Sequence, residues 1–330
     1  MEKIRQPIVT VAGHIDHGKT TLLDCIAGTC VAEKEPGLIT QKISFMLIPA
    51  DLVKKKCKKL LDQFKIKIEV PGFLFIDTPG HAAFTNLRKR GGSLADLAIL
   101  VIDINEGIME QTKESIEILK LSKVPFVVAL NKIDKLVGWK KLSDLIKENL
   151  ELQAEYTKKD FEKKFYKIIS DLSEIGFDCD LFFRIKDFKK QLAIVPCSAK
   201  TSEGIPELIA MLAGLSQKFL RDELVLGKEA KGTILEVKKE KGVVEIEAIL
   251  YDGVLSKNDF LVISTFEEPI VAKARNLQEA LPCRKGFLQK EKISAAAGIK
   301  LSFSAEIAQN IIPGMPFLAT KEQDIEKAKD

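Results

Sequence analysis

Short runs of aliphatic and β-branched residues recur along the first two-thirds of the chain. They lie at residues 8–12, 73–76, 97–104, 125–130 and 192–195, and polar loops and stretches with helical spacing separate them. Strands that alternate with helices favour a mainly parallel sheet covered on both faces. Most of the polar motifs come directly after a run, at the C-terminal edge of the predicted sheet, where such folds bind ligands.

Two later segments have a different pattern of hydrophobic and polar residues. Residues 139–191 are rich in Lys, Glu, Leu and Phe at helical spacing, which predicts a helical insertion between the fourth and fifth strands. After residue 227, short alternating runs separated by Gly and Pro turns predict a small antiparallel β-barrel. We therefore expect an α/β domain over residues 1–222, a β-barrel second domain over 223–320, and the start of a linker helix or a tail over 321–330.

Composition adds limits on class and location. The 330 residues are 46% hydrophobic and 30% charged, which is typical of a soluble globular protein of two or three domains. The longest apolar stretch, residues 97–104, is interrupted by Asp103 and is far shorter than the roughly 20 residues of a membrane helix. The N-terminus has no apolar run followed by a cleavage site. We expect a cytoplasmic protein without a membrane partner.

Charge and cysteine usage exclude little more. The net charge of +4 is too mild to indicate a nucleic-acid partner by itself. The basic cluster KKKCKK at residues 54–59 is typical of a solvated helix face, with a contact surface for RNA as the alternative. The six cysteines have no C-x-x-C spacing, so the sequence predicts neither a zinc site nor a disulfide framework.

The first motif predicts a phosphate-binding loop. Residues 13–20 match G-x-x-x-x-G-K-[ST] between a predicted strand and a predicted helix. Glycines let backbone N–H groups close around phosphate oxygens, and the helix N-terminus adds a favourable dipole. We expect Lys19 to reach the β- and γ-phosphates and the Thr20 hydroxyl to bind Mg²⁺. The predicted phosphate-binding residues are Gly13, His14, Asp16, His17, Gly18, Lys19, Thr20, Thr21 and Gly80.

The second motif, D-T-P-G-H at residues 77–81, follows another predicted strand. We expect Asp77 to hold Mg²⁺ through water and the Gly80 backbone N–H to sense the γ-phosphate. We also expect a mobile threonine to close over the metal, and it should lie in the sequence between the first two motifs. Thr40 is the best candidate for this Mg²⁺ ligand, and a plain surface loop at residues 35–41 is the alternative.

The third motif, N-K-I-D at residues 131–134, predicts recognition of guanine. The Asp134 carboxylate can accept hydrogen bonds from guanine N1–H and the exocyclic amine, whereas adenine would leave it unsatisfied. Asn131 should brace the neighbouring loops, and the Lys132 stem should cover the base plane. Ser198, Ala199 and Lys200 follow the fifth strand and could add a backbone N–H to guanine O6. In this order, the motifs are specific for a GTP-binding domain.

The chain resembles the translational GTPases, and within them the archaeal and eukaryotic initiation factor 5B family, the counterpart of bacterial initiation factor 2. This resemblance implies a P-loop GTPase fold followed by a β-barrel, and an enzyme that hydrolyses GTP on the ribosome. It also implies that the factor promotes joining of the ribosomal subunits in translation initiation, and that hydrolysis releases it. The resemblance rests on the segments His17–Asp24, Gly37–Gln41, Phe75–Gly91, Ala95–Gly107 and Ile194–Ile209.

The resemblance also implies roles for single residues. His81 would be the catalytic residue that orients the attacking water, with Ile15 and Ile39 as apolar gates. Asp16 would hold K⁺ or Na⁺ beside the phosphates, and the alternative is that it only hydrogen-bonds the loop backbone. Leu38 stands where the family usually has a second glycine, which can alter how the first switch loop folds.

The implied partners are GTP, GDP and the ribosome, through ribosomal RNA of both subunits, with the factor acting as a monomer. Initiator tRNA would be held by further domains of the family that this chain does not include. The alternative is another GTPase of tRNA delivery or ribosome assembly, such as a relative of the archaeal initiation factor 2 gamma subunit, although that family lacks the long insertion.

Overall fold

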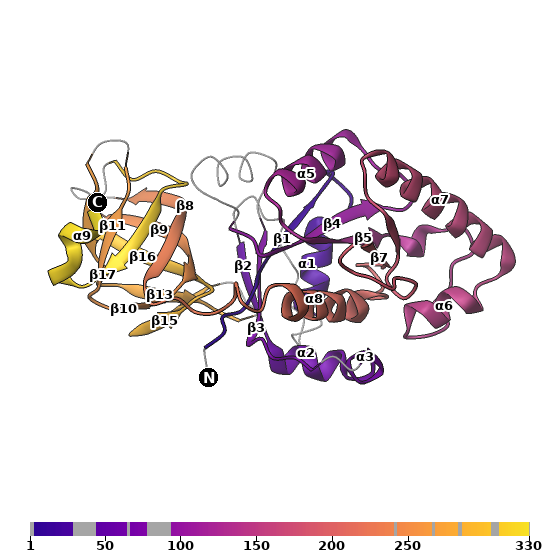
Figure 1. Cartoon of the computed structure of the whole chain (residues 1–330), viewed down its shortest axis with the longest axis horizontal. Helices are drawn as coiled ribbons and strands as arrows, with labels where there is room; N and C mark the ends of the chain where they lie inside the picture. Colours follow the sequence, from indigo (N-terminus) through magenta and orange to yellow (C-terminus); the bar gives the residue numbers. More distant parts are fainter. Residues whose placement is uncertain are drawn as a thin grey trace.

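The computed structural model contains two units that lie side by side along the longest axis of the molecule (Figure 1). The first is an α/β unit around a seven-stranded sheet, and the second is an antiparallel β unit around an eight-stranded sheet. Both parts of the predicted fold class are confirmed. The structure describes residues 3–28, 44–64, 67–77, 94–240, 243–265, 268–282, 286–304 and 310–329.

The α/β sheet is parallel except at one edge. Its strands β1, β4 and β5 are buried along their whole length, as expected for parallel strands with helices on both faces. At the edge, β2 runs antiparallel to β3. The strand order is β2 (Ser44–Pro49), β3 (Gly72–Asp77), β1 (Ile8–Gly13), β4 (Leu97–Asp103), β5 (Phe126–Asn131), β7 (Leu192–Pro196) and β6 (Cys179–Leu181).

Helices cover both faces of this sheet. In Figure 1, α5 lies above the sheet, and α2, α3 and α8 lie below it. No helix within the described ranges is long and apolar enough to cross a membrane. The helices are α1 (Lys19–Gly28), α2 (Ala50–Lys56), α3 (Lys58–Phe64), α5 (Glu110–Leu121), α6 (Ile146–Leu152), α7 (Glu155–Glu174) and α8 (Ile205–Phe219), with a 3₁₀ turn η1 (Ile133–Lys135) after β5.

The predicted helical insertion at 139–191 contains α6 and α7, and it also contributes a strand. Residues 179–181 form β6, which pairs in parallel with β7 and extends the sheet by one strand. Three residues are too few to show an alternating period, so the sequence pattern could not distinguish this strand from the neighbouring helices. The insertion is therefore anchored in the sheet of the α/β unit.

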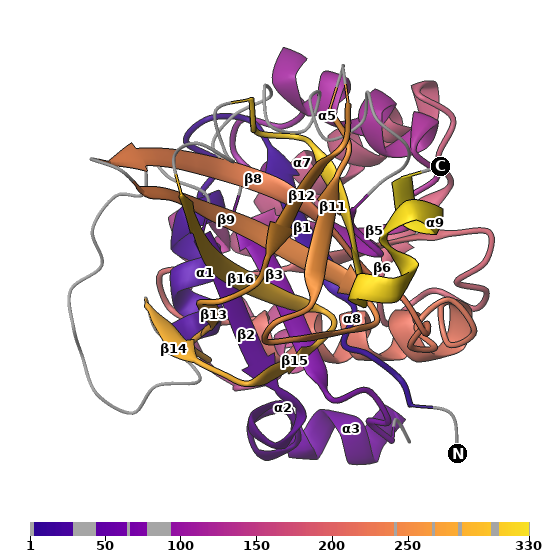
Figure 2. The same cartoon turned by 90° about the vertical axis from the view of Figure 1, so that its left-hand side faces the viewer.

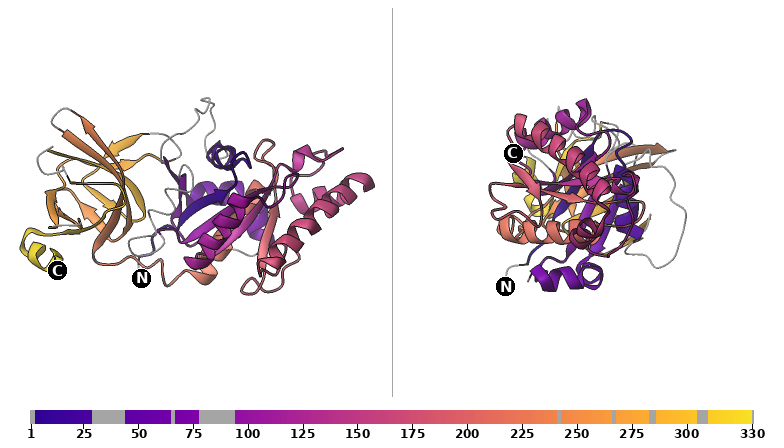
Figure 3. Two further views of the ribbon diagram at one scale, coloured as in Figure 1. Left: turned by 90° about the horizontal axis from the view of Figure 1, so that it is seen from above. Right: turned by 90° about the vertical axis from the view of Figure 1, so that its right-hand side faces the viewer.

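The described strand pairs of the second unit are all antiparallel, and seen from above they curl around a common apolar interior (Figure 3). The main sheet has the order β12 (Ile270–Lys273), β11 (Phe260–Ile263), β17 (Pro316–Thr320), β8 (Ala230–Glu240), β9 (Val243–Asp252), β16 (Ala297–Ser304), β13 (Leu277–Ala280) and β14 (Phe287–Gln289). A small sheet pairs β10 (Val254–Ser256) with β15 (Lys292–Ser294), and η2 (Glu322–Asp324) and α9 (Ile325–Lys329) come last.

The two units meet through a shared apolar cluster. Strands β8 and β9 cross in front of β1 and β3 in Figure 2. Contact at this interface is close, because a Cβ added at Gly298 of β16 would lie 2.4 Å from the ring of Phe45 of β2. The β-barrel thus packs on β2 and β3, the strands next in sequence to Thr40 and to the D-T-P-G-H motif. The buried members of the cluster are Ile8, Leu74 and Ile76 from the first unit and Leu235, Ile249 and Ala296 from the second.

Candidate nucleotide-binding site

The loops after β1, β5 and β7 come together at the C-terminal edge of the sheet. Asn131, which is 2% exposed, connects all three. Its amide nitrogen donates to the His17 carbonyl at 2.9 Å, and its amide oxygen accepts the Ala199 backbone N–H at 3.0 Å. A single side chain therefore sets the distance between the predicted phosphate loop and the predicted guanine-binding loops.

The backbone of the phosphate loop has a shape that requires glycine at two positions. The φ angles are +137° at Gly13 and +92° at Gly18. A Cβ at Gly13 would lie 2.3 Å from the Val101 carbonyl oxygen, and one at Gly18 would lie 2.6 Å from the Asn131 side-chain nitrogen. Because glycine adopts positive φ without steric cost and adds no Cβ, it is the residue that fits here.

Lys19 begins α1 and folds back over the loop. Its ammonium donates to the carbonyl oxygens of Gly13 and His14 at 2.9 and 2.6 Å. Thr20 and Thr21 lie exposed in the first turn of the helix, where the macrodipole favours negative charge. The positive charge, the helix start and the two exposed threonines therefore lie next to one another in the chain, a combination that suits a phosphate group and its metal ion.

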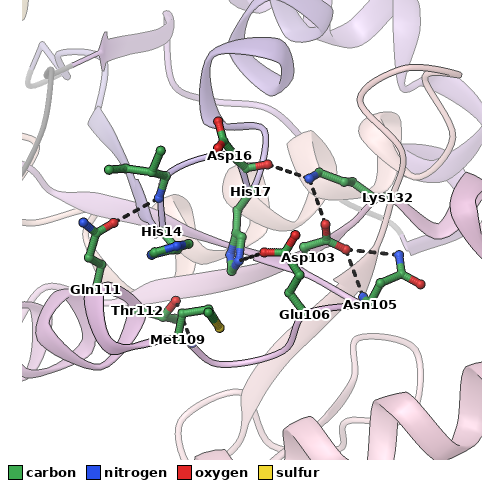
Figure 4. A network of polar contacts seen from close by, with 12 residues as sticks. His14, Asp16, His17, Asp103, Asn105, Glu106, Met109, Gln111, Thr112 and Lys132 are labelled. Carbon is green, nitrogen blue, oxygen red and sulfur yellow. Dashed lines mark hydrogen bonds and ion pairs between the residues drawn. The ribbon is translucent and has the colours of Figure 1, made fainter.

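His17 supports this loop from within the protein (Figure 4). Its ring is fully buried, with Nδ1 3.3 Å from the Val101 carbonyl and Nε2 3.2 Å from the Glu106 carboxylate. Burial lowers the pKa of His17 below its ordinary value, although the Val101 carbonyl and the Glu106 charge act in the opposite direction. Since the ring is enclosed, a phosphate contact at His17 would have to come from its backbone.

The two residues that flank this part of the loop differ in exposure, because Ile15 faces outward and the His14 ring packs on His17. Ile15 is 60% exposed, and its backbone N–H donates to the Gln111 side chain at 3.0 Å. The ring of His14 meets the ring of His17 edge-on, with centroids 5.1 Å apart. Gln111 lies on α5, so this helix holds the outer side of the loop in place.

On the base side, Lys132 connects two loops. It has a positive φ of 64°, and its ammonium donates to the Asp16 carbonyl at 2.5 Å and pairs with the Asp103 carboxylate at 2.8 Å (Figure 4). Asp103 ends β4, is 2% exposed, and also accepts the backbone and side-chain N–H groups of Asn105 at 2.9 and 3.1 Å. The ammonium at the end of the Lys132 side chain is thereby held by two acceptors, which fixes the direction of its aliphatic stem.

Asp103 was not among the predicted site residues. Burial raises the pKa of its carboxyl, but the hydrogen bonds from Lys132 and Asn105 outweigh burial and leave the pKa below its ordinary value. The carboxylate is therefore charged at neutral pH and anchors Lys132. One sequence signal could have found it, because Asp103 is the polar residue at the end of an apolar run, where a strand meets the ligand-binding edge of the sheet.

Asp134 and Ser198, two of the predicted guanine-binding residues, contact each other. The Ser198 hydroxyl donates to one oxygen of Asp134 at 2.7 Å, and Ser198 is fully buried. The Ala199 N–H already donates to Asn131, and the Thr201 N–H donates to the Ser198 hydroxyl at 3.2 Å. A guanine O6 would therefore share the Ala199 N–H or take the N–H of exposed Lys200.

Part of the predicted catalytic machinery lies outside the described residues, namely Ile39, Thr40, Gly80 and His81. Asp77 ends β3, and its backbone alone is described. Strands β1 and β3 are parallel neighbours, so Asp77 ends at the same sheet edge at which the phosphate loop begins. Within the described ranges, no three His, Cys, Asp or Glu side chains form a metal-binding group.

Comparison with known proteins decides the family. Residues 4–218 match the family model described as "Elongation factor Tu GTP binding domain". The chain belongs to this family of GTP-binding proteins. Membership agrees with the order of the phosphate, D-T-P-G-H, N-K-I-D and S-A-K motifs along the α/β unit.

The relatives of the chain within this family include initiation factors. It is 47% identical to the "Probable translation initiation factor IF-2" of Sulfurisphaera tokodaii, over 99% of this chain and 56% of the relative. For the protein of the same name from Staphylothermus marinus, the identity is 49%, over 97% and 54%. This chain thus spans little more than half the length of these relatives.

Comparison with solved structures also indicates a relationship to initiation factors. The crystal structure of GDP-bound aIF5B from Aeropyrum pernix matches with a TM-score of 0.88 and 45% identity, over 99% of this chain and 56% of that one. The predicted resemblance to the initiation factor 5B family is confirmed. The elongation factor SelB of Methanococcus maripaludis matches with a TM-score of 0.62 at 19% identity, which shows a shared fold alone.

Proposed function

We propose that this chain is the GTP-binding and GTP-hydrolysing part of a translation initiation factor that acts on the ribosome. The observation that carries the proposal is the contact of Asn131 with both the phosphate loop and the loop of Ser198 and Ala199, in a chain of the GTP-binding family. The names of relatives that match 97% or more of the chain support the role in initiation.

The arrangement suits a guanine nucleotide with Mg²⁺. The Asp134 carboxylate would accept guanine N1–H and the exocyclic amine, while Lys132 would cover the base. Lys19 and the N-terminus of α1 would bind the β- and γ-phosphates. Enzymes of this kind use Mg²⁺, which neutralises phosphate charge, and the oxygen donors Thr20, Asp77 and Thr40 would hold it.

In the proposed reaction, water attacks the γ-phosphorus while the bond to the β-phosphate oxygen breaks, and GDP and phosphate leave. His81 would orient the water through a ring nitrogen, and Ile15 and Ile39 would shield it from solvent. Asp16 has a positive φ of 64°, and its carbonyl already accepts from Lys132. A K⁺ or Na⁺ ion would therefore depend on its exposed carboxylate, and the alternative role is a hydrogen bond within the loop.

On the ribosome, the GTP state would promote joining of the subunits, and hydrolysis would release the factor. The γ-phosphate would order the segments around Thr40 and His81, which adjoin the strands that pack on the β-barrel. Contacts to ribosomal RNA of both subunits are part of this proposal, and so are action as a monomer in the cytoplasm and binding of initiator tRNA by regions of the relatives beyond this chain.

Calorimetry with GDP and ADP tests the nucleotide assignment. A buried site that hydrogen-bonds its ligand rejects an analogue lacking those groups by about 10⁴-fold, so we expect GDP to bind about that much more tightly than ADP. Asp134→Asn exchanges an acceptor for a donor and should shift the preference towards xanthosine diphosphate. Equal affinities for GDP and ADP would contradict the assignment of residues 131–134.

Single-turnover hydrolysis with ribosomes tests the catalytic assignment. His81→Ala should keep wild-type affinity for a GTP analogue, because a water-positioning group acts mainly in the transition state. Hydrolysis on ribosomes should fall by about 10²–10⁴-fold. A wild-type rate for His81→Ala would remove His81 from catalysis and leave the nucleotide assignment intact.

A further inference from the structure

The loop that supports Asp134 is closed by Glu203. The Ser198 backbone N–H donates to the Glu203 carbonyl at 2.9 Å, and the two residues form an antiparallel bridge. Within the loop, the Thr201 hydroxyl donates to the Glu203 carboxylate. Because Ser198 in turn holds Asp134, the position of Glu203 sets the position of the base-binding carboxylate.

The other carboxylate oxygen of Glu203 faces the insertion. It accepts the indole N–H of Trp139 at 3.1 Å and the side-chain amide N–H of Asn149, on α6, at 2.7 Å. Glu203 is 4% exposed and Asn149 is fully buried, so water competes little for these bonds. Hydrogen bonds to a charged acceptor in a buried setting are stronger than those between neutral groups.

Asn149 is itself fixed by the insertion. Its amide oxygen accepts the Leu142 backbone N–H at 2.8 Å and the Gln153 side chain at 3.1 Å. Gln153 closes the same segment, because its amide nitrogen donates to the Lys140 carbonyl at 2.6 Å and its oxygen accepts the Lys140 N–H at 3.1 Å. The insertion therefore presents a rigid donor to Glu203.

We propose that Glu203 is a positioning residue for guanine recognition, through which Trp139 and Asn149 of the insertion hold the base-binding loop in place. The inference rests on the proposed function and deepens it, since it assigns a role to an insertion that has no phosphate or base motif of its own. Loss of the Glu203 carboxylate releases the loop from the insertion and lets Asp134 leave the orientation that guanine needs.

The test compares GDP with inosine diphosphate, which lacks the exocyclic amine that Asp134 would bind. In Glu203→Ala we expect GDP affinity to fall about tenfold, the value of roughly one such interaction, and inosine diphosphate affinity to fall less. The preference for GDP should therefore shrink. A residue that merely stabilises the fold would lower the melting temperature without changing this ratio between two ligands of the folded protein.

Further variants keep the test informative if Glu203→Ala does not fold. Glu203→Gln retains an oxygen that accepts from Trp139 and Asn149, so it should keep most of the GDP preference. Trp139→Phe removes one donor and keeps the ring, and it should weaken GDP binding by about threefold in the same direction.

The matched control is Glu207→Gln. Glu207 is also buried, lies on α8, and accepts the Ile146 backbone N–H of the insertion at 2.8 Å. It touches the insertion without closing the base-binding loop, so this variant should keep the wild-type GDP affinity and GDP preference. An equal loss of GDP preference in Glu207→Gln would overturn the assigned role of Glu203.

The outcomes separate the two proposals. If wild-type protein binds GDP no better than ADP, the proposed function and this inference both fail. If wild type prefers GDP, and folded Glu203→Ala and Trp139→Phe keep its GDP affinity and its preference over inosine diphosphate, the positioning role of Glu203 is overturned and the proposed function stands.

Discussion

The two halves of the candidate site are built in different ways. The phosphate loop consists of consecutive residues, 13–20, and its shape comes from positive φ angles at Gly13, Asp16 and Gly18. The base side draws Lys132, Asp134 and Ser198 from two separate loops, and its shape comes from hydrogen bonds between side chains.

This difference affects how each half responds to change. A backbone conformation that requires glycine fails as a unit when a Cβ is added, because the atoms it meets belong to the backbone or to a buried bridging residue. A set of side-chain bonds loses one contact at a time, so single substitutions on the base side have smaller effects. The base side is also open to influence from distant elements, such as β4 and the insertion.

Gly18→Ala should give the largest effect. The new Cβ would lie 2.6 Å from the Asn131 side-chain nitrogen at a φ of +92°, so the loop must move or Asn131 must release His17. The left-handed backbone alone costs about 1–2 kcal/mol and the clash adds to this, so we expect GDP affinity to fall by about 100-fold or more. Calorimetry of GDP binding measures this loss.

Gly28→Ala is its control. Gly28 ends the helix that Lys19 begins, and a Cβ there meets nothing within 4 Å. The variant should bind GDP as wild type does. A similar loss of affinity in both variants, or none in Gly18→Ala, would contradict the account of the phosphate side as fixed by its backbone.

Asp103→Asn should give an intermediate effect on the base side. The substitution removes the charge that pairs with Lys132, while the amide oxygen still accepts from Asn105. Lys132 then loses one of its two anchors, and we expect GDP affinity to fall about tenfold, equivalent to about 1.4 kcal/mol. Nucleotide dissociation followed by stopped flow should show the change mainly as faster release.

Asp96→Asn is the control for this carboxylate. Asp96 precedes the strand that Asp103 ends, and it binds Arg5 through two hydrogen bonds of 2.7 and 2.8 Å. This variant should lower the free energy of unfolding and leave GDP affinity unchanged. If Asp96→Asn slows or accelerates GDP release as much as Asp103→Asn does, the anchoring of Lys132 is not the cause.

Mild acid should give the smallest effect, a loss of stability that comes from His17 on the phosphate side and not from Asp103 on the base side. The pKa of His17 in the folded protein lies below 6.5, its value in the unfolded chain. At a pH between the two pKa values, the unfolded chain therefore binds a proton that the folded chain does not. Stability is therefore lost as the pH falls through 6.5, by at most about 1.4 kcal/mol per pH unit. The pKa of Asp103 is lowered from 3.8, so its contribution is lost only in stronger acid.

Urea unfolding at pH 7.5, 6.5 and 5.5 measures this dependence. In His17→Gln, which cannot bind the proton, the part of the loss between pH 6.5 and 5.5 that comes from His17 should disappear. Identical pH dependence in wild type and His17→Gln would show that the buried ring does not carry the effect, and acid would then not separate the two halves.

Much of the fold and the phosphate side could be predicted because the signals are local. The G-x-x-x-x-G-K-T motif contains its own turn, glycines and helix start, so eight consecutive residues specify the loop. The buried strands are mainly apolar runs, and the β-barrel strands show alternating apolar and polar residues between turns. The short strand β6 was missed, since a three-residue strand has no period of its own.

By itself, the sequence determined the order of the motifs, the two-unit α/β and β-barrel organisation and the family resemblance. Each of these depends on patterns among residues that are close together in the chain. Only the tertiary structure decided that Asp103 anchors Lys132, that the His17 ring faces the interior, and that Glu203 bonds to the insertion. Such contacts join residues far apart along the chain, 84 positions for His17 and Val101 and 64 for Trp139 and Glu203. Their strength depends on distance and burial in the folded protein, and neither quantity leaves a pattern in local sequence.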